Sequence, residues 1–326
     1  MAKRIPLVSV VMPVFNGEDY LAAAIESILN QTFTDFEFII VDDGSQDASA
    51  AICQTYAERD SRIRCIQLGK NQGEASARNA GIAAAEGQLV AMMDCDDVSL
   101  PERIQLQFDY LDANPDIGAV GVGIQVVNED LSPLFPYRLP QSHALILLAM
   151  LFGETAIARN SIMMRRDLFI ASGGYNPEFE VATDYEYFLR IVWQVRMRYS
   201  SLKTILYLYR QHEASIMGQA TTHNLPAKAH ARREALERLW GEAPAETLDL
   251  LLRLRPGFKL GWRERRVARR DLERLIEAMV AHGWVYPGDQ PRLAAEIRQR
   301  LEWTTPRLWQ QFLHWRRHHF SARART

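Results

Sequence analysis

The chain has 326 residues, of which 48% are hydrophobic and 24% are charged, and these proportions exclude a disordered or membrane-embedded protein. Three cysteines without a CxxC pair exclude a disulfide framework and a thiolate zinc site, and favour a reducing compartment. The formal net charge of -2 divides into an acidic body, residues 1–219 with 17 Lys/Arg against 28 Asp/Glu, and a basic tail, residues 220–326 with 21 against 12.

The N-terminal apolar run is predicted to be a buried strand. Pro13 interrupts it and no small-residue cleavage site follows, so it does not resemble a secretory signal. No stretch reaches the roughly 18 uninterrupted apolar residues that a membrane span requires. Together with the cysteine usage, this predicts a cytoplasmic protein, whose membrane contact, if any, is peripheral and on the inner face.

Short β-rich runs alternate with amphipathic segments through the first 113 residues. Strands are expected over 7–14, 37–41, 63–68 and 89–93, each followed by a helix. This alternation predicts βαβ units and a mostly parallel, Rossmann-like sheet flanked by helices. Because ligands bind outside the carboxyl ends of such strands, the polar clusters that follow them are expected to converge on one crevice.

The first such cluster contains Asp42 and Asp43, whose carboxylates can accept from a nucleobase N–H or a ribose hydroxyl. Alternatively, this loop simply caps the next helix through Ser45 or Asp47. Further on, the run NQGEASARNAG makes a glycine turn at Gly73 and presents Arg78 one turn into a helix. Such a helix start can receive a phosphate or a base edge.

The most informative cluster is Asp94-Cys95-Asp96-Asp97, which directly follows an apolar strand. In an extended chain Asp94 and Asp96 point to one side. Two carboxylates without a neighbouring Lys or Arg repel each other unless a cation joins them. A divalent ion completed by substrate phosphates fits this arrangement. The alternative is an acidic turn that caps the helix beginning near residue 101.

Beyond residue 114 the pattern becomes mixed, and residues 225–320 are expected to form several helices rich in Arg, Leu and Trp. Near the end, aromatic residues alternate with basic ones over 307–319. This pattern predicts either an amphipathic helix on an anionic membrane surface or a helix packed on the body of the protein. No nucleic-acid partner is predicted, because no recognised motif accompanies the charge.

The ordered set PVFNG, VDDGS, NQGEASARNAGI and DCDD resembles the inverting family 2 glycosyltransferases of the GT-A fold. The resemblance implies a catalytic domain over residues 1–219, with a nucleotide-binding half (1–113) and an acceptor-binding half (114–219). The basic α-helical extension, residues 220–326, follows it. The first acidic loop would hold the nucleoside, and the DxD triplet would hold Mn²⁺ or Mg²⁺ on the diphosphate.

Carried over residue by residue, the resemblance assigns nucleotide contacts and metal ligands. The nucleotide-binding candidates are Pro13, Asp42, Asp43, Gly73, Arg78 and Asp94. Asp96 is the expected metal ligand, supported by Asp94, and His212 occupies the place of a family histidine that approaches the metal or the diphosphate. Arg210 beside it is a candidate for neutralising the departing diphosphate.

Downstream, Gly173-Gly174-Tyr175 precedes Thr183-Asp184, where the family usually shows a Glu-Asp pair. Asp184 aligns with the family's general base, whereas Thr183 replaces one acid. Glu186 is the alternative base, although it lies about 200° around the helix from Asp184. Arg190, on the same helix, is a further candidate.

The resulting hypothesis is an inverting, non-processive transferase, because the QxxRW motif and the membrane spans of processive relatives are missing. It would move a sugar from a nucleoside-diphosphate sugar, with a UDP-sugar expected, to a glycan or a lipid-linked acceptor. One alternative is a sugar-nucleotide pyrophosphorylase, although the glycine-rich basic loop it needs after the first strand is absent. The other is a non-catalytic sugar-nucleotide-binding protein, suggested by Thr183.

Overall fold

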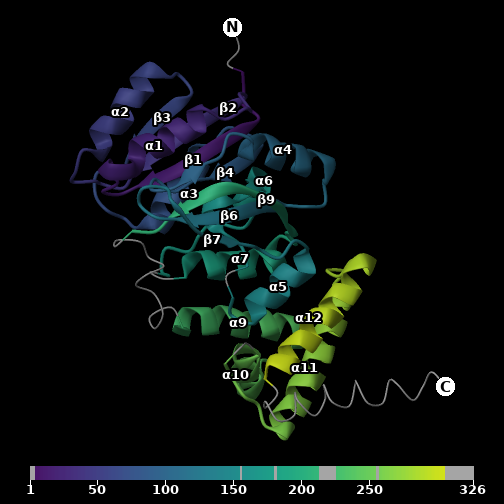
Figure 1. The fold of residues 1–326 in the computed structure, drawn as a ribbon. Coiled ribbons are helices and arrows are strands. Elements are labelled where there is room, and N and C mark those ends of the chain that lie inside the picture. Colours follow the sequence, from purple (N-terminus) through teal and green to yellow (C-terminus); the bar gives the residue numbers. More distant parts are fainter. Residues whose placement is uncertain (1–3, 155, 180–181, 213–224, 255–256, 305–326) are drawn as a thin grey trace, which may run out of the picture.

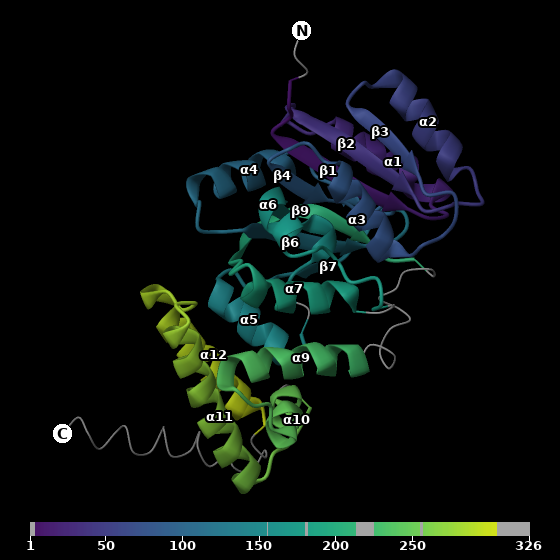
Figure 2. The same cartoon turned by 180° about the vertical axis from the view of Figure 1, so that it is seen from behind.

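The computed structural model describes residues 4–154, 156–179, 182–212, 225–254 and 257–304. Its centre is a nine-stranded sheet with the order β3-β2-β1-β4-β8-β6-β9-β5, and β7 pairs with β6 outside this path. Helices flank the sheet, and the helical extension lies at one end of the molecule (Figure 1; Figure 2 from behind). The predicted fold class is confirmed.

The first half of the sheet is parallel, as the sequence predicts. It consists of β3 (Ile63–Gln67), β2 (Phe36–Asp42), β1 (Val8–Val14) and β4 (Leu89–Met92). β1 and β2 are buried along their whole length, as expected for strands covered by helices on both faces. Their carboxyl ends therefore lie at one edge of the sheet.

The second half of the sheet is mixed. β8 (Met163–Arg165) runs antiparallel to β4 and to β6 (Ala119–Val127), and β6 pairs in parallel with β9 (Tyr199–Arg210). The outer strands are β5 (Val98–Ser99), antiparallel to β9, and β7 (Pro133–Tyr137), antiparallel to β6. Because β5 directly follows the acidic triplet, its pairing with β9 brings the end of β9 back to that triplet.

Side-chain alternation along β1 divides the core between the two faces. Val10 and Met12 belong to one apolar cluster, and Val11 belongs to the other. The first face is covered by α1 (Glu18–Leu29), α2 (Ser49–Arg59) and α4 (Arg103–Ala113). The second is covered by α3 (Glu74–Ala84), α5 (His143–Leu151) and α7 (Thr183–Gln194), with α6 (Arg166–Ala171) beside them.

The helical extension shares the core of the second face. It comprises α9 (Leu225–Trp240), α10 (Ala245–Arg253), α11 (Trp262–Ala281) and α12 (Gln290–Trp303), and α9 packs along α7. One apolar cluster continues from the sheet through α5 and α7 into these four helices. The described part of the basic tail is therefore packed against the helices that cover the second face of the sheet.

Two buried arginines fix the extension to the segment around α5. The Arg232 guanidinium donates to the carbonyls of Leu151 and Leu248 at 2.8 and 2.9 Å. Arg300 makes a two-pronged ion pair with Glu154 at 2.7 and 2.9 Å. Both arginines are almost fully buried, whereas the Glu154 side chain is partly exposed, and the contacts fix the register of the helices.

His143, at the first turn of α5, lies where the extension meets the sheet. Its ring packs on Tyr199 and Trp284, with centroid separations of 5.9 and 6.0 Å, and its Nδ1 accepts the N–H of Tyr199 at 3.3 Å. Burial, with a smaller contribution from Arg198, lowers the pKa of His143 to about 3. This imidazole is therefore neutral in the folded protein over the physiological range.

We expect His143 to make the fold sensitive to acid. In the unfolded chain His143 becomes protonated below its usual pKa of 6.5, whereas in the folded chain it stays neutral until the pH nears 3. The free energy of unfolding should thus fall by up to about 1.4 kcal/mol per pH unit in this window. Urea unfolding at pH 7 and pH 5 should show a smaller acid loss in His143→Gln than in the wild type. Equal losses in both proteins would contradict the assignment.

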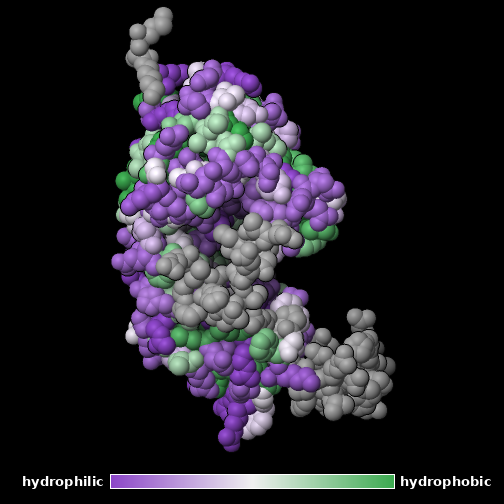
Figure 3. Space-filling view, turned by 90° about the vertical axis from the view of Figure 1, so that its left-hand side faces the viewer, coloured by the Kyte–Doolittle hydropathy of each residue, from purple (hydrophilic) through white to green (hydrophobic). Residues whose placement is uncertain are grey.

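The described surface gives no direct sign of a membrane segment. Within the described residues, no helix combines the length and the apolar character needed to cross a bilayer. Hydrophilic side chains predominate on the face shown in Figure 3. The aromatic and basic residues at 307–319, on which the expectation of peripheral membrane contact depends, lie outside the described residues.

Candidate active site

The acidic triplet forms a compact cluster just beyond β4. Carboxylate oxygens of Asp94, Asp96 and Asp97 lie within 4.8 Å of one another. Asp97 is fully buried and accepts from Asn160 Nδ2 at 2.7 Å and from the Arg210 N–H at 2.8 Å. Burial, and then Asp96 and Asp94, raise the pKa of Asp97 well above its usual value. Asp97 thus points inward and supports the loop, while Asp94 and Asp96 remain partly exposed.

His212, a further metal-ligand candidate, lies beside Asp96. Its Nε2 lies 3.0 Å from Asp96 Oδ2, and its ring packs on Tyr20 with the centroids 5.0 Å apart. Asp94 is already paired with Arg78 at 2.7 Å, which the sequence did not predict, so a bound cation would chiefly offset the charge of Asp96. Carboxylate oxygens suit both Mg²⁺ and Mn²⁺. The acidic triplet could therefore hold such an ion, with His212 beside Asp96.

Arg210 contacts the acidic triplet from the interior of the protein. Its guanidinium donates from Nε to the carbonyl of Asp96 at 2.7 Å, hydrogen-bonds the carbonyl of Glu129, and lies 4.6 Å from the ring centroid of Tyr20. The residue is only 4% exposed. These contacts tie the acidic triplet to the end of β6, which differs from the expected exposed position facing a diphosphate.

At the nucleotide end, Asp43 organises the loop before α3. Its two carboxylate oxygens accept the N–H groups of Gln72 and Gly73 at 2.7 and 2.9 Å. Gly73 has φ +88°, a left-handed conformation that favours glycine. Asp43 is 3% exposed, so in this structure its carboxylate is used within the protein. The sequence analysis gave Asp43 and Gly73 as separate nucleotide-binding candidates, and the structure shows them hydrogen-bonded to each other.

Asp42 and Pro13 lie beside this loop at the carboxyl ends of their strands. Pro13 is in register with Val41 of the neighbouring strand, and Asp42 Oδ1 accepts the N–H of Ser45 at 3.1 Å. Gly44 has φ +78°, and a Cβ there would lie 2.7 Å from the main chain of Lys70. Only glycine permits this close approach between the first acidic loop and the loop before α3.

Arg78 links the nucleotide end to the acidic triplet. It is 2% exposed, and its Nη2 contacts Glu74 Oε1 at 2.6 Å and Asp94 Oδ1 at 2.7 Å. Burial lowers the pKa of Arg78, but Glu74 and Asp94 more than offset this and raise it above its usual value. The guanidinium is therefore permanently charged and holds Asp94 in place.

Asp184, the candidate general base, lies in the first turn of α7. Its carboxylate is 23% exposed and lies 4.0 Å from Arg159 Nη1. Thr183 does not act as a second acid, since its Oγ1 donates to the carbonyl of Phe179 at 2.8 Å. Among the residues that the structure describes, no donor hydrogen-bonds to Asp184. This leaves its lone pairs available for a proton.

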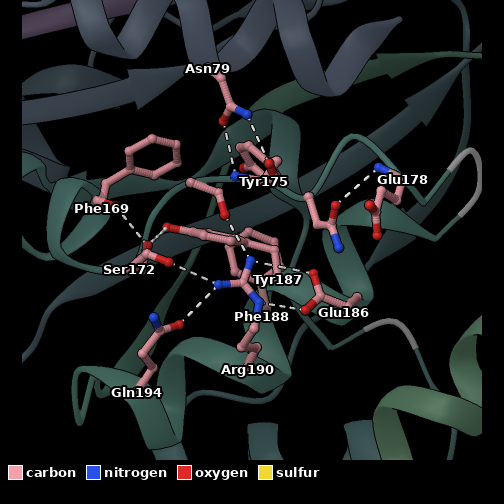
Figure 4. A network of polar contacts seen from close by, with 12 residues as sticks. Asn79, Phe169, Ser172, Tyr175, Glu178, Glu186, Tyr187, Phe188, Arg190 and Gln194 are labelled. Atoms are coloured by element: carbon pink, nitrogen blue, oxygen red, sulfur yellow. Dashed lines mark hydrogen bonds and ion pairs between the residues drawn. The ribbon is translucent and has the colours of Figure 1, made fainter.

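Glu186 and Arg190, the other candidates on α7, form a separate buried network (Figure 4). Arg190 Nε pairs with Glu186 Oε1 at 2.5 Å, and its other nitrogens donate to the carbonyls of Ser172 and Gly174 at 2.9 and 2.7 Å. Glu186 is 4% exposed. The pair thus fixes the glycine turn before α7, and Glu186 does not share the exposed position of Asp184.

Several residues at the site have no counterpart in the sequence prediction. Arg159 and Asn160 lie in the short turn η1 (Arg159–Ser161), and each contacts an acid of the site. Asn79 holds the turn from α3, accepting the N–H of Tyr175 at 2.9 Å and donating to its carbonyl at 2.8 Å. The only sequence signal for η1 was a pair of polar residues inside an apolar stretch.

Comparisons with known proteins agree with this geometry. The family model described as Glycosyl transferase family 2 matches residues 9–172. The O-antigen biosynthesis glycosyltransferase WbnJ of Escherichia coli is 31% identical over 234 residues, which are 71% of this chain and 90% of that protein. The uncharacterized glycosyltransferase MJ1057 of Methanocaldococcus jannaschii is 32% identical over 189 residues, 57% of this chain and 65% of that protein.

Solved structures show the same fold. Staphylococcus aureus TarS 1–349 in complex with UDP-GlcNAc aligns over 91% of this chain and 90% of that chain, with a TM-score of 0.60 and 20% identity. The mannosyltransferase PcManGT from Pyrobaculum calidifontis, in complex with GDP-Man and Mn²⁺, aligns over 86% and 87%, with a TM-score of 0.50 and 18% identity. The likeness to TarS covers more than residues 1–219, so it includes part of the helical extension.

Proposed function

Since this chain belongs to glycosyl transferase family 2, we propose that it transfers one sugar at a time from a nucleoside-diphosphate sugar to an acceptor hydroxyl, with inversion at the anomeric carbon. The observation that carries this proposal is a series of ion pairs. It runs from Asp94 through Arg78, Glu74 and Arg159 to Asp184. This series connects the acidic triplet to the carboxylate of Asp184, and it supports the proposal that both belong to one site.

The donor would bind over the carboxyl ends of β1, β2 and β4. Pro13, Asp42 and the loop that Asp43 holds at Gly73 would frame the nucleoside, with UDP as the expected nucleotide. TarS is described in complex with UDP-GlcNAc, and PcManGT with GDP-Man. Both support a nucleotide sugar as the donor class.

Asp96, with Asp94 and His212, would hold Mn²⁺ or Mg²⁺ at this site. When bound, such an ion supplies positive charge to the diphosphate as the bond to the sugar breaks. Asp97 and Arg210 keep the loop in shape from within the protein. Arg78 keeps the Asp94 carboxylate at the right orientation.

Asp184 is proposed to remove the proton from the acceptor hydroxyl. The acceptor oxygen then forms a bond to the anomeric carbon as the bond to the diphosphate breaks, and the electron pair leaves with the diphosphate. Attack from the face opposite the leaving group inverts the configuration. A glycan or lipid-linked hydroxyl is the expected acceptor, and contact of the basic tail with the inner face of the membrane is part of the same proposal.

A donor screen tests the proposal. Thermal unfolding of the full chain is measured with UDP, GDP and dTDP and with their sugars, each with and without Mn²⁺. A ligand at 100 times its Kd stabilises the folded state by about 2.7 kcal/mol. We expect one nucleotide, and its sugar, to raise the melting temperature more in Mn²⁺ than without it.

The same screen separates the alternatives. The selected sugar nucleotide should slowly release its nucleoside diphosphate, because a transferase site leaks some transfer to water. Stabilisation without any turnover would favour a non-catalytic binding protein. Stabilisation by nucleoside triphosphates in preference to diphosphates would argue against transfer.

A further inference from the structure

Arg159 lies between two acids that come from different elements. From η1 its Nη2 lies 3.1 Å from Glu74 Oε1 at the start of α3, and its Nη1 lies 4.0 Å from Asp184 Oδ1 at the start of α7. Glu74 is also bound by Arg78 at 2.6 Å. One guanidinium thus spans from the nucleotide side of the site to its acceptor side.

We propose that Arg159 is the positioning residue for Asp184 and that Glu74 anchors it. The inference rests on the proposed function, since it assigns the support of the general base. In this arrangement the carboxylate of Asp184 is oriented by a fixed positive charge. The acid that supports Asp184 through Arg159 is thus Glu74 on α3, because the residue next to Asp184 is Thr183.

The two distances explain why Arg159 orients Asp184 without occupying it. At 3.1 Å the guanidinium is within hydrogen-bond distance of Glu74, whereas at 4.0 Å it is beyond that range from Asp184. Asp184 therefore keeps lone pairs for an acceptor proton. A base must have such a lone pair within reach of the hydroxyl that it deprotonates.

Glu74 is a suitable anchor because it stays ionised. Burial opposes ionisation, but Arg159 and then Arg78 outweigh it and lower the pKa of Glu74 to about 2. Burial likewise lowers the pKa of Arg159, but Glu74 and then Asp184 raise it above its usual value. The charges of this pair are therefore constant over the pH range in which the protein works.

The immediate neighbour of Asp184 cannot take over this task. The Thr183 hydroxyl donates to the carbonyl of Phe179, so it stabilises the start of α7. On the other face of the helix, Arg190 is bound to Glu186 and to two main-chain carbonyls. Arg159 is thus the cation that contacts Asp184 in the described part of the chain.

The test is a double-mutant cycle in the full-length protein. Turnover is followed as release of nucleoside diphosphate from the donor that the screen selects, and binding is measured with UDP and Mn²⁺. Arg159→Met should lower kcat by roughly tenfold to a hundredfold, the size expected for a misplaced catalytic group. UDP affinity should change by less than about twofold, and Arg159→Lys should recover most of kcat.

The cycle with Asp184→Asn distinguishes positioning from folding. If Arg159 acts through Asp184, then Arg159→Met should have almost no effect on the residual rate of Asp184→Asn. Arg64→Met is the matched control, because Arg64 also contacts two acids. It lies near the amino end of β3, away from the acidic triplet, and its distances to Glu37 and Glu86 are 3.0 and 3.7 Å. Its kcat should equal that of the wild type.

Four results would overturn the inference. Equal losses from Arg159→Met in both backgrounds would mean that it acts independently of Asp184, and a large loss of UDP affinity would mean that it contacts the diphosphate. Unchanged kcat in Arg159→Met and Glu74→Gln, with an active wild type, would overturn this inference alone. A wild type inactive on every sugar nucleotide would overturn the proposed function and this inference with it. Glu74→Gln keeps the test valid if Arg159→Met does not fold.

Discussion

Asp184→Asn is expected to lower turnover by two or more orders of magnitude while changing UDP affinity by less than about twofold. The substitution keeps the size of the side chain and removes its basicity. The 23% exposed carboxylate has no hydrogen bond within the described residues, so its loss should not disturb the fold. Steady-state kinetics with the selected donor, and a UDP titration in Mn²⁺, measure the two effects.

Glu186→Gln is the matched control on the same helix. Because Glu186 is buried against Arg190, this variant should lower the melting temperature and leave kcat of the folded protein near the wild-type value. If Asp184→Asn instead loses UDP binding, Asp184 belongs to the nucleotide site. If it keeps its turnover, the base is another residue, and a product with retained configuration would exclude direct displacement.

Asp96→Ala should abolish the Mn²⁺-dependent part of the stabilisation by UDP. Asp96 is more exposed than Asp94 and contacts His212 at 3.0 Å, so its removal would take away the expected metal ligand. Loss of a stabilisation corresponding to 100 times Kd amounts to about 2.7 kcal/mol. Melting temperatures with UDP, with and without Mn²⁺, measure it directly.

Asp35→Ala serves as the control for this variant. Asp35 precedes β2, at the amino end of the sheet, and its ion pair is with the exposed Arg4. It should keep the full response to Mn²⁺. If Asp96→Ala also keeps that response, the acidic triplet is a structural turn, which is the alternative that the sequence left open.

Much of the fold and part of the site were predictable because they depend on local patterns. Apolar runs ending in polar clusters identify the four parallel strands, and the acidic triplet follows β4 as expected. The place of Asp184 at the start of a helix was also correct. Each of these features is set by residues that are neighbours in the sequence.

The remaining features depend on contacts between distant segments. The Asp43 carboxylate accepts hydrogen bonds from the N–H groups of Gln72 and Gly73, about 30 residues away in the sequence. No residue pattern in the first acidic loop predicts these partners. The short β8 separates β4 from β6, which turns the second half of the sheet into a mixed one. Arg159 meets Glu74 and Asp184 because η1, which leads into β8, lies against β4 and β6.

The shared core of the extension limits how this enzyme can be recombined with its relatives. Arg300 near the end of α12 binds Glu154, five residues before Arg159, and Arg232 binds the end of α5 just upstream. A chimera joined at residue 219 would pair helices from another protein with the segment that contains Arg159, the proposed positioning residue of Asp184. The unit that evolution or an engineer can exchange intact therefore extends through α12.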